Sequence, residues 1–298
     1  MPDYFFVSDL HGNPGRYQHL FSAIRREKPD AVFLGGDLLP SGFLSAVSGD
    51  SSPDAFIQDV LEVGFETLKG ELGVDYPRVF LILGNDDTRS SEDDLRNGEK
   101  KRLWEYIHNK AVDLNEYLVF GYAYVPPTPF LLKDWERFDV SRFTDVGCIP
   151  PEEGWRTVPV DESILQFATI SEDLDRLSMD VDLSNAIFLF HAPPYHTHLD
   201  RAALDGKYIE HVPLDVHIGS IAIKRFIEAR QPRITLHGHV HESSRLTSFW
   251  HEKIGRTFSF SAALEGQTLS LIRFDPNQPE NARRILIDER GMTEESVL

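Results

Sequence analysis

Short apolar runs that each end abruptly in a glycine or a polar residue recur along the chain. Runs of this length, bounded by turn residues, are typical of strands that are buried on both faces. We therefore expect buried strands at five places. They are residues 4–7, 31–34, 79–83, 186–190 and 234–236.

Apolar residues at helical spacing predict amphipathic helices around these runs. The spacing indicates helices over residues 17–27, 56–68, 164–177 and 218–229. A polar helix is expected over residues 92–112, although Gly98 weakens it. Strands that alternate with helices are typical of an α/β fold.

Other parts of the chain show different patterns. Residues 40–54 are rich in Ser, Gly and Asp and predict a loop, and residues 117–125 predict a strand. Apolar and polar residues alternate in the C-terminal part, which favours antiparallel strands over residues 257–261, 268–272 and 284–287. The last eight residues, 291–298, are expected to form a flexible tail.

The stretch from 126 to 160 has its own character. Its six prolines exclude long helices, and its aromatic residues make it too apolar for a disordered linker. A lid over a site and an extended stretch packed on the domain surface both fit this pattern. We treat it as an insertion within one domain that spans residues 1–290.

Composition narrows the class of protein. The chain has 298 residues, of which 41% are hydrophobic and 26% are charged, as in ordinary soluble globular domains. Its formal net charge is −18. Phosphate backbones need clustered Lys and Arg, so duplex DNA or RNA is not expected as the main partner. Solubility explains the acidity, and bound divalent cations would offset it locally.

Targeting signals and membrane segments are not visible in the sequence. The single cysteine, Cys148, excludes an internal disulfide and suits a reducing compartment. No apolar run approaches the roughly 20 residues that a membrane helix needs, and no signal peptide precedes the first strand. We expect a cytoplasmic protein without a membrane partner.

Each of the five apolar runs is followed by side chains that can bind a metal ion. Sites in α/β sheets form just beyond the carboxyl ends of strands, so these side chains are expected to converge. They are Asp9, His11, Asp37, Asn85, His191, His239 and His241. Nitrogen and oxygen ligands without thiolate suit Mn, Fe, Zn, Co or Ni. Seven ligands are too many for one tetrahedral ion and suit two ions about 3.5–4 Å apart.

The order Asp-x-His, Gly-Asp, Gly-Asn, His and Gly-His-x-His resembles the calcineurin-like metallophosphoesterase family, over roughly residues 3–274. Each motif alone is common by chance, but all five in this order are specific. The resemblance implies a four-layer αββα sandwich with a dinuclear metal site at one edge. By motif position, Asp9, His11 and His241 would hold one metal, and Asn85, His191 and His239 the other. Asp37 would bridge them.

One position departs from the family pattern. The family's third motif usually has a histidine after Gly-Asn, whereas this chain has Gly84-Asn85-Asp86-Asp87. That histidine stabilises the phosphate and protonates the leaving oxygen. Asp86 is therefore a candidate replacement acid, and Asp87 is expected to orient a neighbouring group.

Four further residues follow the motifs in sequence. His198 is a candidate acid, and His196 is a candidate acid or substrate-binding residue. Arg89 and Arg245 are candidates for phosphate contact. Solvated loop and surface side chains are the default explanation for all four.

The resemblance and the altered motif together predict a function. A hydroxide held between two divalent cations would attack a phosphoester, and loss of the histidine favours phosphodiesters with good leaving groups. The expected substrate is a small-molecule or nucleotide-type phosphoester. The alternatives are a phosphomonoesterase or nucleotide phosphatase, and a metal-bound scaffold without catalysis.

Overall fold

The five apolar runs form strands at the centres of two sheets, as the sequence predicts. The structure is a computed structural model that describes residues 2–41 and 52–297. Three of the strands are parallel neighbours in one sheet, and two are parallel neighbours in the other. They are β1 (Tyr4–Val7), β2 (Ala31–Gly35) and β3 (Arg78–Ile82) in the first, and β7 (Ala186–Phe190) and β10 (Ile234–His237) in the second. Nearly every residue of these strands is buried, which explains their continuous apolar sequences.

Further strands extend both sheets. The order is β15-β14-β13-β1-β2-β3-β4 in one sheet and β11-β12-β10-β7-β6-β5 in the other. The added strands of the first sheet are β4 (Glu105–Tyr106), β13 (Leu269–Phe274), β14 (Arg283–Asp288) and β15 (Gly291–Ser296). Those of the second are β5 (Lys110–Leu114), β6 (Tyr117–Tyr122), β11 (His251–Ile254) and β12 (Thr257–Ser261). β13 and β14 are antiparallel as expected, but β12 is parallel to β10 and antiparallel only to β11.

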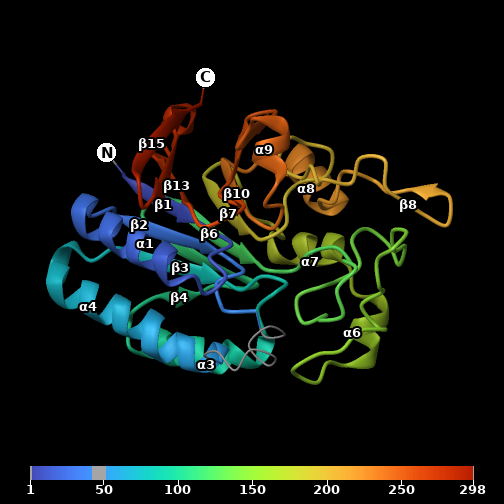
Figure 1. Ribbon diagram of the computed structural model, residues 1–298, viewed down its shortest axis with the longest axis horizontal. Coiled ribbons are helices and arrows are strands. Elements are labelled where there is room, and N and C mark those ends of the chain that lie inside the picture. Colours follow the sequence, from blue (N-terminus) through green and yellow to red (C-terminus); the bar gives the residue numbers. More distant parts are fainter. Residues whose placement is uncertain (1, 42–51, 298) are drawn as a thin grey trace.

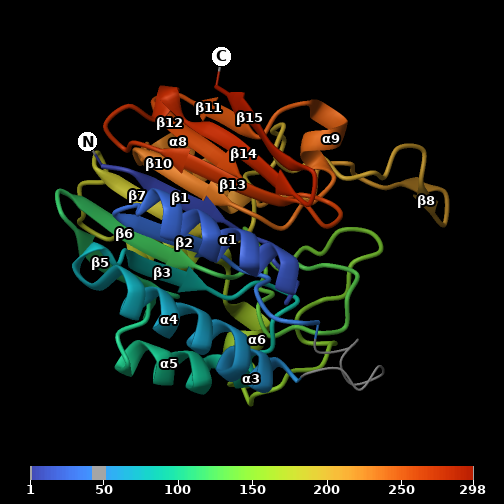
Figure 2. The ribbon, with the colours of Figure 1, turned by 60° about the vertical axis from the view of Figure 1, so that its left-hand side comes forward.

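Helices cover the outer faces of both sheets (Figures 1 and 2). One outer layer holds α1 (Pro14–Glu27), α3 (Pro53–Phe56), α4 (Val63–Leu72) and α5 (Glu92–Lys100), and a π-helical stretch over Ile57–Glu62 joins α3 to α4. The other holds α7 (Ile170–Leu177) and α8 (Ile221–Arg230). The shorter helices are α6 (Glu162–Phe167) and α9 (Ser243–Thr247), with 3-10 turns at Gly73–Asp75, Arg89–Ser91 and Pro279–Asn281.

Aromatic side chains join the two sheets at their inner faces. The ring of Tyr4 on β1 meets Tyr117 on β6 edge-on, with centroids 6.5 Å apart. Phe260 on β12 and Phe274 on β13 lie 5.9 Å apart. All four side chains are buried. Helices outside and two sheets inside make the four-layer α/β sandwich that the family resemblance implied.

The predicted polar helix over residues 92–112 is wrong in its second half. The helix ends at Lys100, and the chain then forms β4 and β5. The cause is Trp104, whose indole packs directly on Gly98, where a Cβ atom would lie 2.0 Å from the ring. Its Nε1 donates to the carbonyl of Leu95 at 2.8 Å. Tertiary packing of one tryptophan therefore outweighs the helical pattern.

Two other predictions differ from the structure. The helix expected over residues 164–177 is two helices, because Ala168 is extended and Thr169 caps α7 by accepting from the amide of Glu172 at 3.2 Å. The expected C-terminal tail contains β15, which pairs with β14. Alternation of apolar residues is absent there, so the sequence offers no strand signal. Most of the loop predicted over residues 40–54 lies outside the described residues.

The proline-rich segment over residues 126–160 forms turns and isolated bridges without a helix, and part of it packs on the domain. Trp135 is fully buried, and the segment forms single bridges such as Phe138 to Thr169. Lys133 and Glu136 form a buried ion pair at 2.5 Å, and Thr128 donates to the same carboxylate. Within the described parts of the chain, no helix combines the length and apolar character that crossing a bilayer requires.

Removing the carboxylate of the buried ion pair should destabilise the fold strongly. Glu136→Ala leaves the buried ammonium of Lys133 without a counter-charge and with only the carbonyl of Thr128 as partner, so the free energy of unfolding should fall by about 3–5 kcal/mol in urea denaturation. The matched control is Glu71→Ala, which breaks the exposed pair with Arg25 and should cost less than about 1 kcal/mol. An equal loss of unfolding free energy in the two variants would contradict the assignment of Lys133 and Glu136 as a buried ion pair.

Candidate metal centre

The seven predicted ligands gather where strands of both sheets end. Asp9 and His11 follow β1, Asp37 follows β2, and Asn85 follows β3. In the facing sheet, His191 follows β7, and His239 and His241 follow β10. Because β2 contacts β7 across the sandwich, the two sets of strand ends meet at one edge.

Two glycines let the strand ends approach closely. A Cβ atom at Gly84 would lie 2.4 Å from the carboxylate of Asp37 and 2.6 Å from Nε2 of His191. Gly36 has φ +93°, and a Cβ atom there would lie 2.7 Å from Nδ1 of His191. Side chains at either position would push the ligand segments apart, which explains why glycine precedes Asp37 and Asn85.

The first group of ligand atoms comes from Asp9, His11, Asp37 and His241. One atom from each lies within 4.8 Å of all the others. Nε2 of His241 is 3.1 Å from Nε2 of His11 and 3.1 Å from Oδ1 of Asp9, and Oδ2 of Asp37 is 3.9 Å from Nε2 of His11. Imidazole nitrogens and carboxylate oxygens that face one another this closely form a donor set that fits a divalent cation.

The second group surrounds His191. Its Nε2 lies 3.1 Å from Oδ1 of Asn85 and 3.3 Å from Oδ2 of Asp37, so Asp37 reaches both groups. Its Nδ1 lies 2.8 Å from the carbonyl of Gly35 and can donate to it, which leaves the Nε2 lone pair directed at the site. The ring of His239 is 5.3 Å from that of His191.

Buried opposite charges shift the pKa values of these side chains. Burial alone would raise the pKa of Asp9, but His241 and His191 lower it to about 2, and the pKa of Asp37 also falls well below its usual range beside His191 and His11. Burial opposes protonation of His11 and His191, yet the surrounding carboxylates raise both pKa values to about 9. The carboxylates of Asp9 and Asp37 and the imidazoles of His11 and His191 therefore each favour the charged form of the other.

Burial instead dominates at His239. Desolvation, together with the nearby charge of His191, lowers the pKa of His239 to about 3. Its ring is therefore neutral at physiological pH, the form in which imidazole binds metal ions. Its backbone amide also donates to Oδ1 of Asp9 at 2.9 Å, which ties the segment after β10 to the one after β1.

Asp87 joins two of the ligand segments. Its carboxylate accepts from the amides of Leu38, Leu39 and Gly84 at 2.8–3.1 Å, so it links the segment after β2 to the one after β3. Asp87 thus orients its neighbours, as the sequence predicts.

Arg16 joins the segment after β1 to the segment between β12 and β13. No pattern in the sequence indicated this role. Its guanidinium donates to the carbonyls of Asp9, Leu264 and Gly266. Two of these partners lie about 250 residues away along the chain. Local patterns carry no signal of contacts between residues so far apart.

Asp86 contacts a candidate ligand directly. Its Oδ2 lies 3.2 Å from Nδ1 of His11, and its Oδ1 accepts from Ser41 at 3.0 Å. Its amide donates to Oδ1 of Asp37 at 2.8 Å. The carboxylate that replaces the family histidine is thus held at the rim of the first group, with about a third of its side chain exposed.

The four other candidates engage different partners. Nδ1 of His198 lies 2.6 Å from Glu252, and its ring packs on Phe249. Arg245 pairs with Glu265 at 2.6 Å.

His196 and Arg89 lie on segments that leave the ligand edge. The ring of His196 is 4.6 Å from that of His217. Arg89 donates to Glu92 and to the hydroxyl of Tyr124, each at 3.2 Å. Within the described residues, the hydrogen bonds and ion pairs of all four candidates do not reach the seven candidate ligands.

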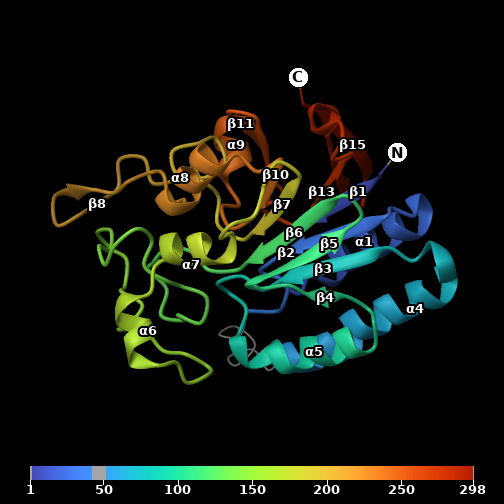
Figure 3. The same ribbon diagram turned by 180° about the vertical axis from the view of Figure 1, so that it is seen from behind.

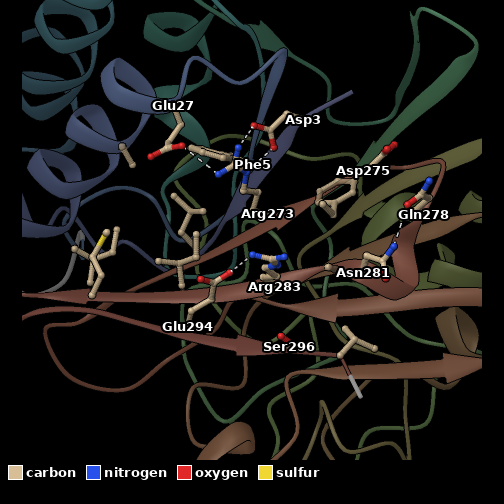
Figure 4. A pocket seen from close by; sticks show the side chains of 18 of the residues that line it. Asp3, Phe5, Glu27, Arg273, Asp275, Gln278, Asn281, Arg283, Glu294 and Ser296 are labelled. Carbon is tan, nitrogen blue, oxygen red and sulfur yellow. Dashed lines mark hydrogen bonds and ion pairs between the residues drawn. The ribbon is translucent and has the colours of Figure 1, made fainter. Parts of the chain in front are cut away.

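A large hollow in the described part of the chain lies elsewhere. It has a volume of about 1080 Å³ and borders α1 and the four strands β1, β13, β14 and β15 (Figure 4). Asp3, before β1, pairs there with Arg273 at 2.7 Å, and Arg283 pairs with Glu294 at 2.9 Å. Asp3 marks the start of β1, whereas the candidate ligands follow its end, so this hollow is separate from the metal centre.

Comparisons with known proteins agree with this geometry. Residues 4–243 match the sequence model of the family described as calcineurin-like phosphoesterase. No curated protein sequence matches the chain significantly. Among solved structures, TT1561 of Thermus thermophilus is 14% identical with a TM-score of 0.50, and a dimetal phosphatase from Danio rerio is 12% identical with a TM-score of 0.51. Each alignment covers 100% of this chain and 99% of the other. At these identities the likeness shows the fold alone.

Cation binding should release protons and strengthen as pH rises. With pKa values of about 9, His11 and His191 are protonated at pH 7 and must lose their protons to bind a cation. Affinity for Mn²⁺ should therefore increase from pH 6 to pH 9 and then level off, with release of at least about two protons at pH 7, since the pKa of His241 is raised as well. Calorimetry in buffers of different ionisation enthalpy measures both. A His19→Ala control on α1 should behave like the parent, and a pH-independent affinity would contradict the model.

Proposed function

Because the chain belongs to the calcineurin-like phosphoesterase family, we propose that it is a phosphodiesterase that depends on two divalent cations. The donor set of nitrogens and oxygens suits Mn, Fe, Zn, Ni or Co. In this proposal Asp9, His11 and His241 hold one cation, Asn85, His191 and His239 hold the other, and Asp37 bridges them. Bound cations would supply a nucleophile at neutral pH and offset negative charge on the phosphoryl group.

The position of Asp37 supports the dinuclear arrangement. Its Oδ2 lies 3.3 Å from Nε2 of His191 in one group and 3.9 Å from Nε2 of His11 in the other. Its Oδ1 accepts from the amide of Asp86, so the side chain is fixed from the backbone of the third motif. A buried carboxylate held between two sets of imidazoles is suited to sharing its charge between two cations.

The preference for diesters rests on one observation, the carboxylate of Asp86 at the rim of the first group. A phosphomonoester carries close to two negative charges at pH 7, whereas a phosphodiester carries one. A fixed carboxylate beside the site repels the monoester dianion more strongly. Because Asp86 replaces the family histidine, the site also lacks the imidazole that would protonate a poor leaving group at this position. Both effects favour diesters with good leaving groups.

Other residues are proposed for roles around the scissile phosphate. His196, Arg89 and Arg245 remain our proposals for substrate contact, and Asp86 and His198 are the alternatives for proton transfer, a role that Asp86 can fill only in its protonated, uncharged form. Asp86 has the stronger support of the last two, since it touches a candidate ligand while His198 is engaged by Glu252. Arg245 would have to exchange its partner Glu265 for phosphate.

The function is tested with two p-nitrophenyl substrates. Metal-stripped protein should regain activity when Mn, Fe, Zn, Ni or Co is added, and bis-p-nitrophenyl phosphate should be hydrolysed with a higher kcat/KM than p-nitrophenyl phosphate. A preference for the monoester would overturn the diester assignment. Two bound ions without turnover of either substrate would favour a scaffold.

A matched pair of aspartate variants controls this assay. Asp37→Ala should lower metal-dependent turnover by at least about a hundredfold, since even outer partners of metal ligands are worth 10–100-fold. Asp30→Ala changes an exposed aspartate at the opposite end of β2 and should keep full activity. Full activity in Asp37→Ala would contradict the bridging role.

Substitutions at Asp86 separate charge from proton donation. Asp86→His should raise monoesterase relative to diesterase kcat/KM by about tenfold or more, because general acid help is worth about 10²–10⁴-fold. Asp86→Asn removes the charge without adding an acid. If the ratio of monoesterase to diesterase kcat/KM rises in both variants, charge repulsion by Asp86 selects the substrate. If the ratio rises only in the histidine variant, acid catalysis does. An unchanged ratio in both would show that this position does not select the substrate.

A further inference from the structure

Exposed apolar side chains are concentrated on two segments of the molecule. Among the described residues, seventeen large hydrophobic side chains are exposed. Seven lie within residues 130–167 and four within residues 208–218, which together make up less than a fifth of the chain. Phe143 is 71% exposed and Tyr208 is 63% exposed. Where such side chains adjoin one another on a folded domain, they mark a surface that binds something apolar.

Both segments leave the edge that carries the candidate ligands. The first follows β6, which is parallel to β7, and the second belongs to the connection that begins with His191 at the end of β7. Loops at the carboxyl ends of parallel strands frame the site in α/β proteins. A group attached to the scissile phosphate would therefore extend toward these two segments.

The second segment is an arm that projects from this end of the molecule. It contains a small hairpin of β8 (Tyr208–Ile209) and β9 (Val212–Pro213), which extends away from both main sheets beside the first segment (Figures 1 and 3). A Cβ atom at Gly147 would lie 2.5 Å from Cδ1 of Ile209, so the two segments touch. At the base of the arm, the rings of His196 and His217 lie 4.6 Å apart.

The charge of these two segments limits the chemical class of molecule that could bind to them. Among the exposed residues of the segment 130–167, five are acidic and one is basic, and residues 208–218 contain two acidic residues and no Lys or Arg. An acidic surface disfavours nucleic acid and anionic lipid bilayers. The exposed side chains are aromatic and aliphatic, which suits a neutral apolar group.

We propose that the substrate is an amphiphilic phosphodiester, in which one ester group is a long apolar chain that binds to these two segments. The proposal rests on the phosphodiesterase function above and names the class of substrate for the same site. The reaction is hydrolysis: water adds to phosphorus, the bond to the leaving oxygen breaks, and that oxygen takes up a proton unless the leaving alcohol is acidic.

The test uses alkyl p-nitrophenyl phosphates that differ only in the alkyl group, from methyl to dodecyl, below the concentrations at which they form micelles. The reacting centre and leaving group are constant, so chain length alone changes. Since a fully buried methylene is worth up to about fourfold, kcat/KM should rise by at least about tenfold across the series, mainly through KM. Equal kcat/KM throughout would overturn the proposal while the phosphodiesterase stands. Absence of turnover for every member would overturn the proposed function itself.

Variants locate the binding surface. Phe143→Ser, Tyr208→Ser and Ile209→Ser combined should remove most of the chain-length dependence and leave kcat/KM for the methyl ester unchanged. The matched control, Val63→Ser with Val74→Ser, removes exposed apolar side chains near α4, where Val74 precedes β3 and lies away from the ligand edge. It should keep the full dependence. A dimer in sedimentation that the triple variant dissociates, with a flat chain-length series, would assign the surface to a second copy and contradict the proposal.

Discussion

The carboxylate of Asp37 lies between the two groups of ligand atoms, and the rest of the centre depends on that placement. A buried charge is stable only with opposite charges and hydrogen bonds around it. Here His191, His11 and the amide of Asp86 supply them. These partners follow the ends of three different strands. The two sheets must therefore pack in their native arrangement before the charge of Asp37 is balanced by its partners.

Several features of the surroundings serve this one requirement. Gly36 and Gly84 remove side chains that would separate the strand ends. Asp87 fixes the two segments of the first sheet to each other through three amides, and burial next to Asp37 raises its pKa to about 7. Arg16 reaches from α1 to the segment between β12 and β13, and its guanidinium also donates to the carbonyl of Asp9. The fold itself therefore positions the candidate ligands.

The central strands and the gathering of ligands could be predicted from the sequence because both rest on local signals. A continuous apolar run identifies a doubly buried strand, and the residue after it identifies the edge where chemistry is placed. Local signals do not predict the packing of Trp104, the strand β15 or the contacts of Arg16. Each is determined by a tertiary partner: the helix surface at Gly98, the edge of β14, and the carbonyls near residue 265. The fold class follows from periodicity, whereas the ends of elements follow from tertiary contacts.

The first group of ligands joins residues from nearly opposite ends of the chain, with His11 and His241 separated by 230 positions. β1 is likewise completed on one side by β13, whose residues Ile272 to Phe274 pair with it. During synthesis at about 5–20 residues per second, the aspartate and histidine after β1 wait roughly 12–46 s for their partners. The nascent chain therefore exposes β1 and two candidate ligands long before the native geometry of the centre exists, so that metal acquisition there would be one of the last events of its maturation.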